Sequence, residues 1–482
     1  MAFSVFWMIV SLLLSSPNPI PEIEKLVNTF YSPERKDQIT GDIHFDSTVI
    51  DGHADTMMHI INEDSWLPEV NIGEDTSLNI DIPKLQEGGL DAIFFAAYTS
   101  GYHGNNPRSI SRTLAMINAL YWTEKNNADQ LQITSNTLDI IESIRRGEIA
   151  AVPTIEGGYS LEEHNAIELL HQYHDLGIKA VGFNWNYSNA LGEGANRVYG
   201  DPEKTPSQGG LTELGAAVAK EMNKLGMVID VSHMAESTFW DVMEVTGAPI
   251  MATHSGVNAL HDHQRNLTDE QLKAIKENNG VVGIVFYPAF LTDEPEAYAE
   301  DVVDHIEYVV NLIGIDHVAL GSDFDGSDMP ADIQDVTDLP KITDELLNRG
   351  YSNEDIEKIL GKNTLRLLMD VEKAAELVPY NNGNTTDLAI DAAFEMGEML
   401  DSTTPLLTAE IKTANDVKIE ESSLHVVVDG IEYEAQFDSD QSTMSVQVQE
   451  PLREKFHVVT FEAAAENGES VRDTRIFYIE DW

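Results

Sequence analysis

The stretch that decides the fold is Val49-Ile50-Asp51-Gly52-His53-Ala54-Asp55. It begins as a short apolar strand and ends in a histidine and an aspartate two residues apart. Alternate side chains of an extended chain point the same way, so His53 and Asp55 can bind one divalent metal ion. Alone the pattern carries little weight, because a chain with 15 His produces it by chance. Its weight comes from further candidate ligands in the same context.

Four further candidates each follow a short apolar run that is typical of a buried strand. They are Glu156 after residues 151–155, His233 after 227–231, His254 after 249–253 and Asp323 after 317–321. Residues 92–98, 179–183 and 281–286 have the same character, which gives eight expected strands with the run before His53. Amphipathic helical stretches separate many of them, at 109–126, 161–176, 211–225, 236–245, 269–279 and 300–312.

Strands that alternate with helices predict an α/β fold, here a (β/α)8 TIM-type barrel of the metallohydrolase kind. Active sites of such barrels lie at the mouth formed by the C-terminal ends of the strands. The candidate ligands follow strands one, three, five, six and eight. We therefore expect all of them to meet at that mouth.

The C-terminal part has a different pattern. Residues 378–386 form a polar, turn-rich linker. Residues 424–428 and 431–435 then predict a hairpin around the turn Asp429-Gly430. Further strands are expected at 444–448, 456–464 and 475–479. We therefore expect this part to be a small antiparallel, sandwich-like all-β domain. We divide the chain into a signal peptide at 1–16, a barrel domain at 17–378 and a β-rich accessory domain at 385–482.

The termini and the charge bear on location and partners. The apolar core of residues 1–14 has the length of a signal-peptide core, which predicts a secreted or periplasmic protein. An apolar helix docked on the barrel, in a cytoplasmic protein, is the alternative. No hydrophobic tail ends the sequence, so no stable membrane anchor is expected.

With 29 Lys+Arg against 83 Asp+Glu, the net charge of −54 excludes nucleic acid and anionic membranes as partners. Simple solubility and adaptation to high salt both explain this charge.

The ligand types indicate the chemistry. Cysteine is absent, so metal ligation falls to histidine and carboxylates. Five or six such ligands exceed the needs of one zinc ion and indicate two metals bridged by a carboxylate. Glu156 is the natural bridge, because Gly157-Gly158 leave space beside it, and Asp323 is the best candidate to move the proton of the nucleophilic water to a leaving amine. As an alternative, Glu156 and Asp323 cap the helices that follow them.

The motifs together closely resemble the membrane (renal-type) dipeptidases over most of residues 46–368. They are Asp51-Gly52-His53-Ala54-Asp55, Ile155-Glu156-Gly157-Gly158, Gly226 to His233, Thr253-His254-Ser255, Arg265-Asn266 and Gly321-Ser322-Asp323-Phe324-Asp325-Gly326. The resemblance implies a zinc-dependent dipeptidase with two Zn²⁺ per chain, in which a hydroxide activated by both metals cleaves the peptide bond of a dipeptide. It implies His53 and Asp55 on one zinc, His233 and His254 on the other, and Glu156 between them.

The resemblance also implies roles around the metals. Asp323 is the acid/base and forms the catalytic pair with Glu156. Arg265 receives the carboxylate of the dipeptide, which suits a bidentate guanidinium. Tyr287 lies near the substrate, with a plain core position as the alternative. One departure is Trp185, which stands where some members have a substrate-contacting histidine and which cannot carry a proton on and off.

Two other functions stay open as alternatives. One is a different dinuclear amidohydrolase that acts on an N-acyl amino acid, a lactone or a cyclic amide. The other is a non-catalytic secreted binding protein on a barrel scaffold. The context of Arg265 speaks against the first, and the intact ligand set speaks against the second. The expected partner is the dipeptide substrate, and a homodimer is the assembly left open.

Overall fold

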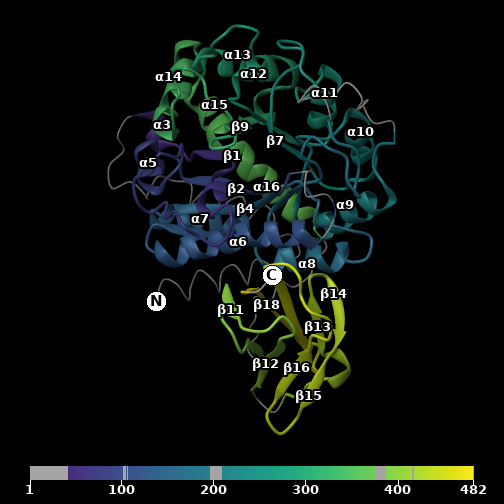
Figure 1. Cartoon of the computed structure of the whole chain (residues 1–482). Helices are drawn as coiled ribbons and strands as arrows, with labels where there is room; N and C mark the ends of the chain where they lie inside the picture. Colours follow the sequence, from purple (N-terminus) through teal and green to yellow (C-terminus); the bar gives the residue numbers. More distant parts are fainter. Residues whose placement is uncertain are drawn as a thin grey trace.

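The chain forms a closed barrel with a β-domain packed on its flank, as the computed structural model shows (Figure 1). The structure describes residues 42–100, 105, 107–195, 209–375, 387–414 and 417–480. The predicted signal peptide and the predicted domain boundaries at residues 17, 378 and 385 lie outside these residues. The division into domains and the location outside the cytoplasm therefore stay predictions.

Eight parallel strands form the ring of the barrel, in the order in which they occur along the chain. They are β1 (Ile50–Ala54), β2 (Ala92–Tyr98), β4 (Ile149–Glu156), β5 (Ala180–Gly182), β6 (Val228–Asp230), β7 (Met251–Ser255), β8 (Val281–Ile284) and β9 (Val318–Leu320). Pairing of β9 with β1 closes the ring. Every predicted strand is present, so the predicted (β/α)8 fold is confirmed.

One strand of the sheet lies outside the ring and was not predicted. β3 (Leu131–Ile133) pairs with the first three residues of β4, and β5 pairs with the last three residues of β4. Three residues are too few to show an alternating pattern, which is why the sequence does not indicate this strand. β3 thus covers the part of the long strand β4 that β5 does not reach.

Helices surround the ring on its outer side (Figure 1). The longer ones are α6 (Pro107–Asn126), α7 (Thr137–Arg146), α8 (Ala166–Asp175), α9 (Glu213–Leu225), α10 (Glu236–Val245), α11 (Asp269–Glu277), α13 (Ala299–Ile313), α14 (Pro340–Asn348) and α16 (Asn363–Ala374). Shorter ones are α3 (Ile43–Asp46), α4 (Thr56–Ile60), α5 (Ile82–Glu87), α12 (Pro288–Leu291) and α15 (Asn353–Glu357). α10 has the predicted bounds, whereas α8 begins five residues after the predicted start at 161.

α7 was not predicted, although its sequence carries both end signals. The side chain of Asn136 accepts a hydrogen bond from the backbone N–H of Asp139, as N-cap residues do. Gly147 ends the helix with a φ of 81°, a conformation that glycine adopts without strain.

The C-terminal domain is a sandwich of two sheets. The four-stranded sheet has the order β10 (Leu388–Ala392), β12 (Leu406–Thr413), β16 (Thr443–Gln447), β15 (Gln436–Asp438). The five-stranded sheet has the order β11 (Glu398–Leu400), β18 (Ser470–Ile479), β17 (Phe456–Ala464), β13 (His425–Val428), β14 (Ile431–Glu434). The predicted hairpin is β13–β14. The predicted all-β, sandwich-like domain is confirmed, with one departure from antiparallel pairing: β11 pairs with β18 in parallel.

The sandwich packs on α6 and α8 through its five-stranded sheet. β17 is buried on both sides: Val459 and Phe461 face the sandwich interior, whereas Phe456 and Val458 belong to the apolar core of the barrel. Gln172 of α8 is fully buried at this contact. Its amide accepts from the backbone N–H of Gly430 (2.7 Å) and donates to the carbonyl of Val427 and to the hydroxyl of Thr460 (3.1 Å each).

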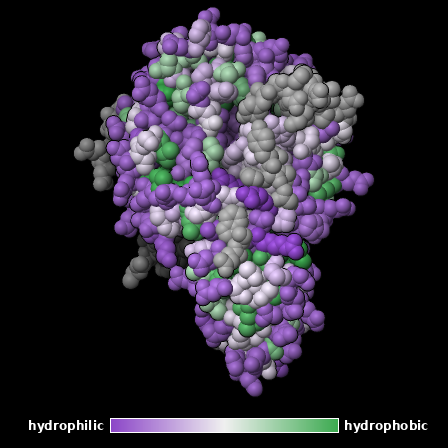
Figure 2. All heavy atoms as spheres, viewed as in Figure 1, coloured by the Kyte–Doolittle hydropathy of each residue, from purple (hydrophilic) through white to green (hydrophobic). Residues whose placement is uncertain are grey.

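The surface agrees with the composition. Figure 2 shows a mainly hydrophilic face with scattered apolar residues, as expected for a chain with a net charge of −54. Among the described helices, none combines the length and apolar character that a membrane crossing requires.

Replacing Gln172 with alanine should destabilise the protein by about 1–3 kcal/mol, because the N–H of Gly430 and the carbonyl of Val427 are left buried without their partner. Urea unfolding of the full chain measures the loss. The matched control is Gln449→Ala on the exposed surface, which should change stability by no more than about 0.5 kcal/mol. Equal effects of the two substitutions would contradict the importance of the contact.

Candidate metal centre at the barrel mouth

The five predicted metal ligands meet at the C-terminal ends of the barrel strands. His53 and His254 are residues of β1 and β7, and Glu156 is the last residue of β4. Asp55 and His233 lie in the loops that follow β1 and β6. All five are buried, with at most 7% of each residue exposed. The fold thus brings together residues that are separated by up to about two hundred positions in the sequence.

Glu156 lies at the centre of the cluster. Its Oε1 is 2.7 Å from Nε2 of His233 and 3.5 Å from Nε2 of His254. Its Oε2 faces the other side, 3.7 Å from Nε2 of His53. That nitrogen is in turn 3.6 Å from Oδ2 of Asp55. The two oxygens of one carboxylate therefore face two separate sets of ligand atoms.

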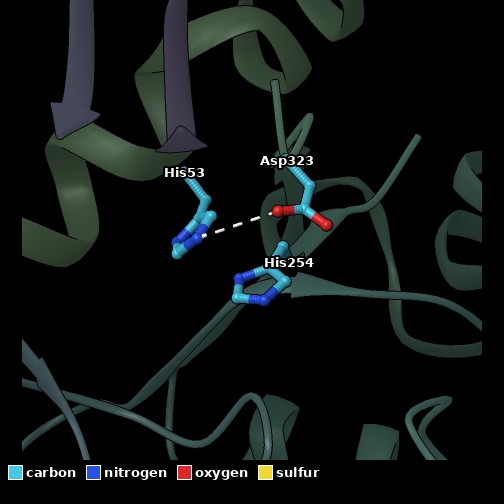
Figure 3. A group of neighbouring side chains, drawn as sticks. All are labelled: His53, His254 and Asp323. Atoms are coloured by element: carbon cyan, nitrogen blue, oxygen red, sulfur yellow. Dashed lines mark ion pairs between the residues drawn. The ribbon is translucent and has the colours of Figure 1, made fainter. Parts of the chain in front are cut away.

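Asp323 lies at the edge of the cluster. Its Oδ1 is 3.9 Å from Nε2 of His53, and the side chains of His53, His254 and Asp323 approach one another from three different strand ends (Figure 3). Asp323 follows β9 and has a φ of 68°. His233 likewise has a positive φ, of 36°. Such conformations cost energy in residues other than glycine and are common where function fixes a side chain.

The donor set fits a divalent metal. Within the cluster, three buried ligand atoms have no hydrogen-bond partner among the described residues, namely Nε2 of His53, Oδ1 of Asp55 and Oε2 of Glu156. Buried polar atoms normally have partners, so this group calls for an ion or another ligand. Imidazole nitrogens and carboxylate oxygens are ligands that zinc prefers. Ligand atoms within 4.8 Å of one another come from His53/Asp55/Glu156, Glu156/His233/His254 and His53/His254/Asp323.

Burial and charge act together on the protonation of the cluster. Burial lowers the pKa of His53, but Glu156, Asp55 and Asp323 more than offset this and raise it to about 10. Burial and the charge of Asp55 raise the pKa of Asp323 to about 7. Burial, with His53 and Arg265 nearby, holds the pKa of His254 well below its usual range. The carboxylates thus need positive charge at this place, which a metal ion supplies.

Arg265 lies next to the cluster. It is buried, donates from Nη2 to the backbone carbonyl of His254 at 3.2 Å, and packs over the ring of Phe290. His263 holds the same loop: its ring packs on Phe290 with centroids 4.4 Å apart, and its Nδ1 accepts from the backbone N–H of Arg265. His263, which had no assigned role from the sequence, therefore positions the arginine loop.

Two aromatic residues flank the mouth. Tyr287 is half-buried before α12, and its pKa is raised by burial, by Asp328 and by Asp323. Trp185 is half-buried too, with its ring 6.2 Å from the ring of His233 and 5.1 Å from that of Tyr98. Trp185, the residue that differs from the histidine of some family members, therefore lies beside the predicted metal ligand His233.

Sequence reasoning missed the residues that hold the ligands in place. Oδ1 of Asn186, a residue with a φ of 54°, lies 2.8 Å from Nδ1 of His233. Asp51 and Asp230 are buried carboxylates on β1 and β6. A signal was present, since each of these aspartates precedes a ligand histidine by two or three residues in an apolar strand.

A closed barrel with a buried His/Asp/Glu cluster at its mouth is typical of metal-dependent hydrolases. Comparison with known proteins specifies the family: residues 38–381 match the membrane dipeptidase family, peptidase family M19. The chain belongs to this family.

Relatives and solved structures agree with this assignment. Dipeptidase tcpJ of Claviceps purpurea is 33% identical over 345 residues, which are 67% of this chain and 77% of the relative. A metallo peptidase of Rhodobacter sphaeroides, solved with a phosphinate mimic of the dipeptide L-Ala-D-Ala, is 27% identical, with a TM-score of 0.59 over 67% of this chain and 99% of that one. Dipeptidase AC of the same family is 29% identical, with a TM-score of 0.60 over 67% and 98%.

Zinc should stabilise the protein, because it supplies the positive charge that the buried carboxylates need. Free zinc at 100 times its dissociation constant should raise the free energy of unfolding by about 2.7 kcal/mol. Thermal unfolding with chelator and with added zinc measures the difference. Glu156→Gln should lose most of this rise, because it removes the carboxylate between both ligand sets. A rise of the same size in the variant would show that zinc binds elsewhere.

Proposed function

We propose that this protein is a zinc-dependent dipeptidase that holds two Zn²⁺ ions per chain. The observation that carries the proposal is the central carboxylate of Glu156, whose oxygens face His233 on one side and His53 on the other. A side chain placed in this way would suit a site that holds two metal ions. Membership of the dipeptidase family supports a dipeptide as the substrate.

In this proposal, His53 and Asp55 would hold one zinc ion, His233 and His254 would hold the other, and Glu156 would contribute to both sets of ligands. When bound, the two ions would supply an activated water molecule and polarise the carbonyl of the scissile bond. The chain's own residues then have to orient the dipeptide and move one proton.

Asp323 is the residue proposed to move that proton. Its carboxylate lies at the edge of the ligand cluster, 3.9 Å from Nε2 of His53. From there it takes a proton from the attacking water and gives it to the amine that leaves, so that no free amide anion forms. The positive φ of Asp323 supports a fixed orientation of its side chain.

Arg265 and Tyr287 are proposed to orient the substrate. The guanidinium of Arg265 is a fixed positive charge close to the cluster. Burial lowers the pKa of His233, and Arg265 lowers it further. Burial raises the pKa of Glu156, and Arg265 offsets part of that rise. A free carboxylate two bonds beyond the scissile amide is the group that such a charge binds. Burial, Asp328 and Asp323 together raise the pKa of Tyr287.

A substrate panel tests this function. L-Ala-D-Ala and L,L-dipeptides should be hydrolysed, chelator should abolish the activity, and zinc should restore it at close to two ions per chain. Hydrolysis of lactones or N-acyl amino acids alone would instead indicate another amidohydrolase. Zinc binding without hydrolysis of any compound would indicate a binding protein.

The proposed roles of His254 and Asp323 predict different losses. Asp323→Asn should lower kcat by roughly 10²–10⁴-fold, because an amide cannot accept the proton, while most of the zinc stays bound. His254→Ala should lower both zinc content and activity, because it removes a direct ligand. Steady-state kinetics and elemental analysis of the same preparations measure both. Near-normal turnover in both variants would place the active site elsewhere.

The proposed role of Arg265 predicts a limit on substrate length. Arg265→Lys should raise KM for dipeptides by roughly 10–100-fold with a smaller change in kcat, because one bidentate, charge-assisted interaction is lost. The wild type should prefer dipeptides over tetrapeptides, whose carboxylate lies too far from the scissile bond. Efficient cleavage of tetrapeptides would refute this role.

A further inference from the structure

Two junctions of the barrel differ from the others. Between β1 and β9, and between β6 and β7, the paired strands share a single register pair, Asp51 with Leu320 and Asp230 with Met251. The other neighbours in the ring share at least three pairs. Both junctions lie between strands that carry site residues. Beyond these pairs, backbone hydrogen bonds join only the strand ends, as from Asp323 to His53 and from Val231 to Met251, so side chains can add to what fixes the spacing of these strands.

A buried aspartate takes this role at each junction, with the same set of contacts. Asp230 Oδ1 accepts from the backbone N–H groups of Ser232 (2.9 Å) and Thr253 (3.0 Å), and its Oδ2 accepts from the hydroxyl of Thr253 (2.7 Å). Asp51 Oδ1 accepts from the N–H groups of His53 (3.3 Å) and Ser322 (2.8 Å), and its Oδ2 accepts from the hydroxyl of Ser322.

The two junctions differ in what the hydroxyl contacts next. Oγ1 of Thr253 lies 2.9 Å from Nδ1 of His254. The single hydroxyl hydrogen of Thr253 points to Asp230, since a carboxylate can only accept. Oγ1 must therefore accept from Nδ1–H of His254. A neutral imidazole carries one N–H, so Nε2 of His254 keeps its lone pair, and this atom lies 2.9 Å from Nε2 of His233 and 3.5 Å from Oε1 of Glu156.

We propose that Asp230 is a positioning residue that, through Thr253, fixes the Nδ1-protonated tautomer of His254 and thereby sets the zinc affinity of the His233/His254 position. This inference rests on the zinc site of the proposed function. A histidine can bind a metal only through an unprotonated nitrogen, and the partner of its other nitrogen decides which one that is. His254 is thus prepared for metal before any ion arrives.

Asp230→Asn tests the proposal, because it reverses the direction of the hydrogen bonds. The new amide nitrogen donates to Oγ1 of Thr253, whose hydroxyl is then free to donate to Nδ1 of His254, which lies closer (2.9 Å) than Oγ of Ser232 (3.2 Å). The proton of the imidazole moves to Nε2, which faces the metal position and can no longer bind. Thr253→Val removes the hydroxyl without imposing the wrong tautomer. The reversal therefore predicts a larger loss of zinc affinity for Asp230→Asn than for Thr253→Val.

Two readouts on the full chain are needed. Nitrogen NMR of the zinc-free protein, with His254→Ala for assignment, reports which ring nitrogen of His254 carries the proton. Competition with a chelator reports zinc affinity. We expect Nδ1–H in the wild type and in Thr253→Ser, Nε2–H in Asp230→Asn, and a loss of affinity for the second zinc of roughly 10–100-fold in Asp230→Asn.

Asp51→Asn is the matched control, because it removes an equally buried carboxylate with the same three contacts but no histidine beyond its hydroxyl partner. It should leave the tautomer of His254 unchanged. Unchanged His254 signals in both Asp230→Asn and Thr253→Val, or a larger affinity loss in Thr253→Val, would overturn the proposal. If Asp230→Asn does not fold, the proposal is decided by comparing Thr253→Val with Thr253→Ser. Thr253→Val is expected to show a mixture of His254 tautomers, whereas Thr253→Ser is expected to keep Nδ1–H. A wild type that binds no zinc would refute the proposed function, while the signals of the zinc-free protein would still test this inference.

Discussion

The burial of a carboxylate among three histidines is the constraint on which the mouth of the barrel depends. Glu156 ends the longest strand of the ring and is almost fully buried, so its charge cannot be left to water. The imidazoles of His53, His233 and His254 surround it from three other strands. Such a group is unfavourable alone and becomes favourable with a cation, so we expect stability and metal binding to be linked here.

The same constraint accounts for the polar residues beneath the ligands. The junctions β1–β9 and β6–β7 each have a single register pair, fewer than the other junctions of the ring. Buried aspartates then provide the missing hydrogen bonds from within the strands themselves. Because each one reaches the residue immediately before a site residue, strand spacing and ligand orientation are fixed by one set of contacts.

The parts of this structure that could be predicted from sequence are those with a periodic or ordered signal. The eight apolar runs gave the ring, and the order of His53, Glu156, His233 and His254 along them gave the cluster, because parallel strands bring their C-terminal ends together. β3 could not be predicted, since three residues show no period. The contacts of Asp230 and Asn186 could not be predicted either, because they depend on which strand lies beside which and on how far apart the side chains stand.

β17 belongs to two hydrophobic cores at once, with alternate side chains in the sandwich and in the barrel. A strand that serves two cores couples their unfolding, because opening either core exposes one of its faces to water. The sandwich and the barrel should therefore melt in a single cooperative transition rather than as independent modules. For the evolution of the chain, this means that substitutions in β17 are restrained from both sides, whereas the four-stranded sheet, which does not contain β17, contributes to the sandwich core alone.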